Sequence, residues 1–269
     1  MDALHPWLEY KAPFHLCGNL YHVGGTCSPS YLLDTDDGLL LIDTGFPKTG
    51  YFLIQNIHEL GFDPRNIRWI LHSHGHFDHF GCTRALQEFS GAKTYLGAED
   101  REIANGTLPL SWAEELGTAY DEAFEPDVLL RDGDTLTFGN VTIQCIATPG
   151  HTGGAMGFFF DLQENGKTYR AGTHGGVGFN SMKSEFLKKY GLDPVCRDRF
   201  LASLDRLKLE KVDVFYGNHL WNNRTDEKLA ARAADPAGPN PFIDPAEWEI
   251  FLTQTRRDFL DFIQNDPLQ

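Results

Sequence analysis

The chain has 269 residues, 41% of them hydrophobic, which is enough to bury a substantial core. Its 23 lysines and arginines stand against 38 aspartates and glutamates, and the net charge of −15 argues against unaided binding to nucleic acid or an anionic membrane. No apolar run reaches the roughly 18–20 residues of a membrane helix, and no signal peptide is evident.

Strand and helix patterns alternate through the first half of the chain. Two strands, a helix, a buried strand and a second helix are expected, in this order, over residues 31–43, 52–60, 66–71 and 82–89. Asp36-Asp37-Gly38 is typical of a hairpin turn between the two strands, and Gly61 ends the first helix. Residues 72–81 therefore form a strand-to-helix loop, where several side chains can converge.

The second half of the chain predicts further strands and two longer helices. Strands are expected within residues 128–144, 157–162, 168–171 and 212–216, and a helix over residues 197–209. Residues 172–191 are glycine-rich, then basic and aromatic, which fits either a substrate-facing lid or a connection carrying a solvated helix.

The last part of the chain predicts an extended connector and a final helix. Four prolines lie within residues 235–245. Asp244 is expected to cap the helix that follows, with Pro245 in its first turn and Glu247 three residues after the cap. The length and the regular alternation of elements fit one domain over residues 1–269, and no internal repeat is found.

The loop between the buried strand and the second helix carries an H-x-H-x-D-H pattern. Its members are His74, His76, Asp78 and His79. Neutral imidazoles with one carboxylate are a ligand set that suits Zn²⁺. Adjacent Asp78 and His79 cannot easily reach the same ion as His74 and His76, so the spacing predicts two ions that share one loop. The alternative is a solvated, histidine-rich surface loop.

Two isolated histidines are candidates for the remaining ligands. His151 lies on a glycine-rich turn after the apolar run 141–147, and His219 directly follows the short strand expected over residues 212–216. A lone histidine after a strand is more often an ordinary hydrogen-bonding residue. Both become credible ligands once they are considered together with the clustered histidines.

These motifs, in this order, resemble those of the metallo-β-lactamase superfamily. The segments that carry the resemblance span most of the chain and are residues 18–24, 30–33, 38–45, 74–79, 148–153 and 217–219. The resemblance implies an α/β fold, the four-layer αβ/βα sandwich, with two mixed sheets face to face, helices outside and metals at one edge.

The pattern is most similar to the β-lactamase subclass whose zinc ligands are only histidine and aspartate. By this resemblance His74, His76 and His151 hold one Zn²⁺, while Asp78, His79 and His219 hold the other. Iron or manganese are the alternative metals. The resemblance also implies a small-molecule acyl substrate.

The chain departs from many hydrolases of the superfamily in one respect. These have an aspartate that bridges the two ions, but the corresponding stretch, residues 169–176, has no carboxylate. Asp134 mimics that motif but precedes His151 and fits a β-turn better. This departure disfavours a glyoxalase-type thioesterase or a typical lactonase. His174, in the same stretch, is expected to be a substrate contact, a substitute ligand or a structural hydrogen-bonding residue.

Two ions about 3.5–4 Å apart indicate hydrolytic chemistry. A water between them loses its proton near neutral pH, which gives a hydroxide that attacks an amide, lactam or ester carbonyl. Asp78 is expected to orient this water and to shuttle its proton. Asp43, in the turn after the predicted hairpin, is our candidate for supporting the ligand loop, although it can equally be a plain turn residue.

Other functions stay open at this point. A lactonase or thioesterase of the same superfamily is the nearest alternative, followed by an iron-dependent enzyme that oxidises thiols and by a binding protein that has lost catalysis. The odd number of cysteines, five, without a C-x-x-C pair, indicates reduced thiols and a cytoplasmic location. The sequence does not predict an oligomeric state.

Overall fold

The computed structural model describes residues 3–118 and 123–268, and within them the strands form two sheets. The larger sheet has the order β1-β2-β3-β4-β5-β6-β7, and the smaller one the order β12-β11-β10-β9-β8. Strands β1 to β4 pair antiparallel, whereas β4 to β7 pair parallel. The smaller sheet is antiparallel except for the parallel pair β11 and β12.

The strands of the larger sheet are β1 (Phe14–Cys17), β2 (Leu20–His22), β3 (Tyr31–Thr35), β4 (Gly38–Ile42), β5 (Ile67–Leu71), β6 (Lys93–Gly97) and β7 (Val128–Leu130). Those of the smaller sheet are β8 (Thr135–Phe138), β9 (Val141–Ala147), β10 (Met156–Glu164), β11 (Lys167–Gly172) and β12 (Val214–Phe215). The helices are α1 (Gly50–Glu59), α2 (Phe77–Phe80), α3 (Thr83–Ser90), α4 (Arg101–Ala104), α5 (Ser184–Tyr190), α6 (Cys196–Leu207), α7 (Thr225–Ala234) and α8 (Glu247–Asn265). Short 3₁₀ turns lie at Pro6–Glu9, Pro64–Asn66, Ala98–Asp100 and Asn180–Met182.

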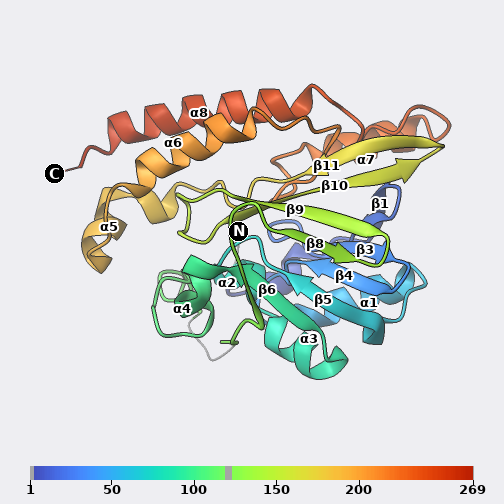
Figure 1. Cartoon of the computed structure of the whole chain (residues 1–269), viewed down its shortest axis with the longest axis horizontal. Helices are drawn as coiled ribbons and strands as arrows, with labels where there is room; N and C mark the ends of the chain where they lie inside the picture. Colours follow the sequence, from blue (N-terminus) through green and yellow to red (C-terminus); the bar gives the residue numbers. More distant parts are fainter. Residues whose placement is uncertain (1–2, 119–122, 269) are drawn as a thin grey trace.

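Successive side chains of each strand point to opposite faces of the sheet, and this alternation defines the layers. In β10, Phe158 and Phe160 face the core between the sheets, while Phe159 faces the helices outside. In β4, Leu40 lies in the same central core, and Leu41 packs on the opposite face with residues of α1 and α3. Helices α6 and α8 lie together over the smaller sheet, and α3 lies beneath the larger one (Figure 1). The predicted four-layer sandwich is therefore confirmed.

The elements expected from the sequence are present, with shifted ends. The hairpin at Asp36-Asp37-Gly38 joins β3 and β4, and the predicted buried strand is β5. The hairpin of β10 and β11 is longer than expected, because it turns only at Asn165 and Gly166. The strand expected over 212–216 is reduced to β12, since the residues around it already lead into loops.

The predicted start of the last helix is wrong in detail. Helix α8 begins at Glu247, and Asp244 accepts a hydrogen bond from the Ala246 N–H in the preceding turn. Glu247 does not complete a capping box. Its buried carboxylate instead pairs with the Lys228 ammonium and with Arg224. Glu247 therefore forms a buried ion pair and does not cap the helix.

Helix α7 is absent from the sequence-based prediction. It has no clear apolar stripe, because cationic side chains make much of its packing. The charged ends of Lys228 and Arg232 lie 5.4 and 4.7 Å from the ring centre of Phe242. Among the described residues, none of the helices has the length and apolar character needed to cross a bilayer.

We predict that Phe159→Ala lowers the free energy of unfolding by about 3–5 kcal/mol, because it removes a fully buried ring from the layer between β10 and α8. Chemical denaturation monitored by circular dichroism measures this change. Leu209→Ala, at a side chain that is 82% exposed, is the control and should change the free energy of unfolding by less than about 0.5 kcal/mol. Equal effects of the two substitutions would contradict the layer assignment.

Candidate metal centre

Six side chains from three loops converge at one end of the two sheets. His74, His76, Asp78 and His79 come from the loop after β5 and the short helix α2, His151 from the loop after β9, and His219 from the loop after β12. They form two groups, His74 with His76 and His151, and Asp78 with His79 and His219. Within each group the potential ligand atoms lie within 4.8 Å of one another.

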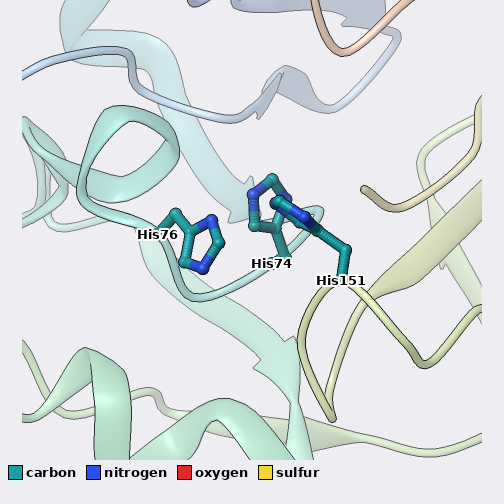
Figure 2. A group of neighbouring side chains, drawn as sticks. All are labelled: His74, His76 and His151. Carbon is teal, nitrogen blue, oxygen red and sulfur yellow. The ribbon is translucent and has the colours of Figure 1, made fainter. Parts of the chain in front are cut away.

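The first group presents three imidazoles toward a common space (Figure 2). Backbone carbonyls orient two of the three rings. His74 Nδ1 donates to Gly175 O at 2.8 Å, and His151 Nδ1 donates to Gly178 O at 2.6 Å. Each Nδ1 therefore carries the proton, which leaves Nε2 with its lone pair free for a metal.

The second group adjoins the first. The ring centroids of His74 and His79 are 4.1 Å apart, and Asp78 Oδ2 lies 3.4 Å from His79 Nε2. His219 Nδ1 hydrogen-bonds to Cys27 O, and its ring stacks on Trp221 at a centroid distance of 4.4 Å. As in the first group, Nε2 is the nitrogen left for a metal.

Asp43 supports the ligand loop from the end of β4. Its carboxylate accepts hydrogen bonds from His79 Nδ1 at 2.8 Å, from Ser73 Oγ at 2.7 Å and from the Ser73 N–H at 2.7 Å. Its backbone has a φ of 59°, a left-handed conformation that aspartate adopts more readily than most residues. The carboxylate thus fixes both a ligand ring and the backbone of the loop.

Asp100 is a second buried carboxylate, which the sequence analysis missed. It accepts hydrogen bonds from the N–H groups of Gly75 at 2.8 Å and Gly154 at 2.7 Å and from Thr152 Oγ1 at 2.6 Å. It therefore joins the His74–His76 loop to the His151 loop. Strand β6, which precedes Asp100, is itself absent from the sequence-based prediction, and an isolated aspartate has no distinguishing sequence signal.

The end of β6 also approaches the His151 loop through glycine backbone. A Cβ atom added to Gly97 would lie only 1.9 Å from Gly154 O. No side chain fits between the end of β6 and the His151 loop. Glycine at this position is therefore required for the close contact that Asp100 completes.

Burial keeps most of the imidazoles neutral, which is the form that binds metals. It holds the pKa of His74 and His76 well below the usual value and lowers that of His151 to about 3. His79 differs. Burial alone would lower its pKa, but Asp78 and Asp43 raise it above the usual value. A proton therefore competes for His79 more strongly than for the three imidazoles of the first group.

Several other polar residues lie outside the two groups. His72 is structural, since its ring nitrogens bond to Tyr95 O and to Thr83 Oγ1. Asp134 caps a turn by accepting the Arg131 N–H at 2.8 Å, as expected for a turn residue. Residues 169–176 contribute no carboxylate, only the Gly175 carbonyl that holds His74.

His174 is not brought to the metal centre. Its side chain is fully buried, with its ring 5.6 Å from that of Phe200, and its Nδ1 accepts the Gly176 N–H at 3.2 Å. It belongs to neither group of potential ligands. His174 is therefore not among the potential metal ligands, and its role as a substrate contact or a structural residue stays a prediction.

A cavity of 190 Å³ lies over the two groups. Besides the six potential ligands it is lined by Phe77, Trp112, Leu116, Gly178 and Asn180. Apolar side chains thus border the space in which a ligand of the metals would lie. Such walls exclude water and strengthen electrostatic interactions inside the cavity.

We predict that acidification removes metal from the second group before the first. Zinc content after dialysis at about pH 8 and about pH 5.5 should fall from two ions to one, because His79 takes a proton at a higher pH than His74, His76 and His151. At about pH 5.5, His219→Ala should keep its remaining ion and His151→Ala should lose it. The opposite order would contradict this assignment.

Asp43→Asn should weaken zinc binding at the second group about 10–100-fold, because an amide cannot accept the hydrogen bonds of both Ser73 and His79. Competition with a chromophoric chelator measures the affinity. Asp134→Asn, in a turn away from the cluster, is the matched control. Unchanged affinity in folded Asp43→Asn protein would show that Asp43 is only a turn residue.

Comparison with known proteins agrees with this geometry. The Metallo-beta-lactamase superfamily profile matches residues 24–216. The structure superposes on BJP-1, a subclass B3 metallo-β-lactamase of Bradyrhizobium japonicum, with a TM-score of 0.88 and 27% identity over 98% of both chains. Hydroxyacylglutathione hydrolase GloC of Haemophilus influenzae is 29% identical over 150 residues, 55% of this chain and 68% of that protein.

An N-acyl homoserine lactonase of Bacillus cereus is 25% identical over 237 residues, 76% of this chain and 84% of that protein. The matches to several other curated relatives span about half of those proteins or less. Since the superfamily profile covers most of the chain and the sandwich is formed as expected, the chain belongs to the metallo-β-lactamase superfamily.

Proposed function

We propose that this protein is a dinuclear zinc hydrolase that cleaves an acyl bond in a small molecule, either a β-lactam or a related amide or ester. The observation that carries the proposal is the pair of adjoining ligand groups, built only from histidine and aspartate. The similarity over nearly the whole chain to a subclass B3 metallo-β-lactamase supports it.

The residues present fit zinc. Each group offers three ligands, which leaves open positions for water and substrate, as in catalytic zinc sites. Burial holds the imidazoles of the first group neutral, and carbonyl groups fix the protonated Nδ1 of His74 and His151. Zinc in both groups supplies an activated water at neutral pH and a Lewis acid for the carbonyl.

The side chains of the protein have separate tasks in this proposal. Asp78 orients the attacking water and receives its proton on a carboxylate oxygen, from which the proton passes to the leaving group. Asp43 keeps the His79 ring in one orientation. Phe77, Trp112 and Leu116 border the cavity and limit the access of bulk water.

The substrate class follows from the ligand set. Residues 169–176 hold no carboxylate that can bridge two ions, which favours a β-lactam or similar amide over a thioester or a lactone. A lactonase is the second candidate, because the match to the Bacillus cereus N-acyl homoserine lactonase covers 84% of that protein. The cytoplasmic location and the single domain expected from the sequence stay predictions.

His76→Ala and Asp78→Ala should each reduce hydrolysis at least about 10³-fold, because each removes a ligand needed to place the activated water. The assay is a panel of nitrocefin, a thioester and a lactone, with circular dichroism to verify folding. His58→Ala, at an exposed histidine of α1, should retain full activity. Undiminished turnover by zinc-loaded Asp78→Ala protein would contradict the role of Asp78.

A further inference from the structure

A second cavity, of 280 Å³, lies beside the metal cavity and shares His76 and His151 with it. It extends from these two histidines toward α5 and α6. Its apolar lining consists of Ile103, Leu110, Phe186, Leu187, Leu192 and Val195. We refer to this cavity as the side pocket.

The walls of the side pocket are mostly apolar, and its charged side chains are exposed. Ile103, Phe186 and Leu187 are buried, with exposed fractions of 7%, 5% and 4%. The charged members of the lining, Asp193 and Arg199, are exposed to solvent. A ligand in the side pocket therefore contacts mainly hydrocarbon, apart from the buried hydroxyl groups of Thr152 and Ser181 in the lining.

An aromatic pair lies between the two cavities. Trp112 lines the metal cavity, Phe186 lines the side pocket, and their rings stack at 5.0 Å with an interplanar angle of 11°. The two cavities share His76 and His151 in their linings. A molecule that reaches both spaces must place its central part next to the first group of ligands.

We propose that the side pocket binds the apolar acyl chain of the substrate while the scissile carbonyl lies at the metal centre. This inference rests on the proposed function and narrows it to acyl compounds with a hydrocarbon substituent. Hydrolysis adds water to the acyl carbon and breaks its bond to the leaving group, so the acyl product is a carboxylate. Burial of the chain against Ile103, Phe186 and Leu187 supplies the affinity.

Saturated carboxylates test the pocket without turnover. Zinc-loaded protein should bind octanoate at least about tenfold more tightly than butanoate in calorimetric titrations, since each buried methylene tightens binding about fourfold. Val195→Trp, which fills the pocket from its rim, should remove this difference. Leu129→Trp on β7 is the matched control, because Leu129 and Val195 are 39% and 38% exposed, and it should leave the difference unchanged.

Cys196 gives an independent measure of occupancy. It lines the side pocket and is half-buried, whereas Cys17, Cys27, Cys82 and Cys145 are buried. N-ethylmaleimide should therefore modify Cys196 first, and octanoate should slow this reaction, while acetate at the same concentration should not. The Cys196→Ser variant identifies the modified thiol by mass spectrometry.

These experiments distinguish a failure of the side-pocket proposal from a failure of the proposed hydrolase function. Octanoate protection of Cys196 together with chain-length-dependent binding supports the side pocket even if no substrate of the panel is hydrolysed. Equal affinities for butanoate and octanoate, or equal protection of Cys196 by acetate and octanoate, would overturn the side pocket even in an active zinc hydrolase.

Discussion

Two buried carboxylates hold the loops of the metal centre in place. Asp43 ties the end of β4 to Ser73 and His79, and Asp100 ties Gly75 to the loop that carries His151. Hydrogen bonds to charged groups contribute about 1.5–3 kcal/mol each. These anchors order the glycine-rich loops in the folded protein. Without them, the loss of loop conformational entropy would have to accompany the assembly of the six ligand side chains.

The sandwich supplies the frame on which these anchors act. Strands β4 and β5 of the larger sheet and strands β9 and β12 of the smaller sheet all end at the metal centre, because the sheets pack face to face through a shared apolar core. Phe158 and Phe160 fill that core from one side and Leu40 from the other. A rigid core therefore fixes the distance between loops that are remote in the sequence.

Much of the metal centre can be predicted from the sequence. Four of the potential ligands lie within six consecutive residues, and the spacing already separates His74 and His76 from Asp78 and His79. His151 and His219 directly follow apolar strands, so their side chains emerge at a sheet edge. Hydrophobic alternation likewise predicts the hairpins, since it directly reflects which face of a strand is buried.

The rest depends on contacts between distant segments, which a single sequence does not encode locally. Asp100 follows a strand as many surface acids do, and only the fold brings it between Gly75 and Gly154. His174 has a glycine-rich neighbourhood like that of His151, yet it points into the protein beside Phe200. The side pocket is lined by residues as distant in the sequence as Ile103 and Val195, so no local sequence pattern predicts it.

Elemental analysis of the purified protein tests the central claim most directly. The account predicts about two zinc ions per chain, and about one in each of the variants His151→Ala and His219→Ala, because each variant breaks one of the two groups. One equivalent of iron in the wild-type protein, or a zinc content that neither substitution changes, would contradict a dinuclear zinc centre at these residues.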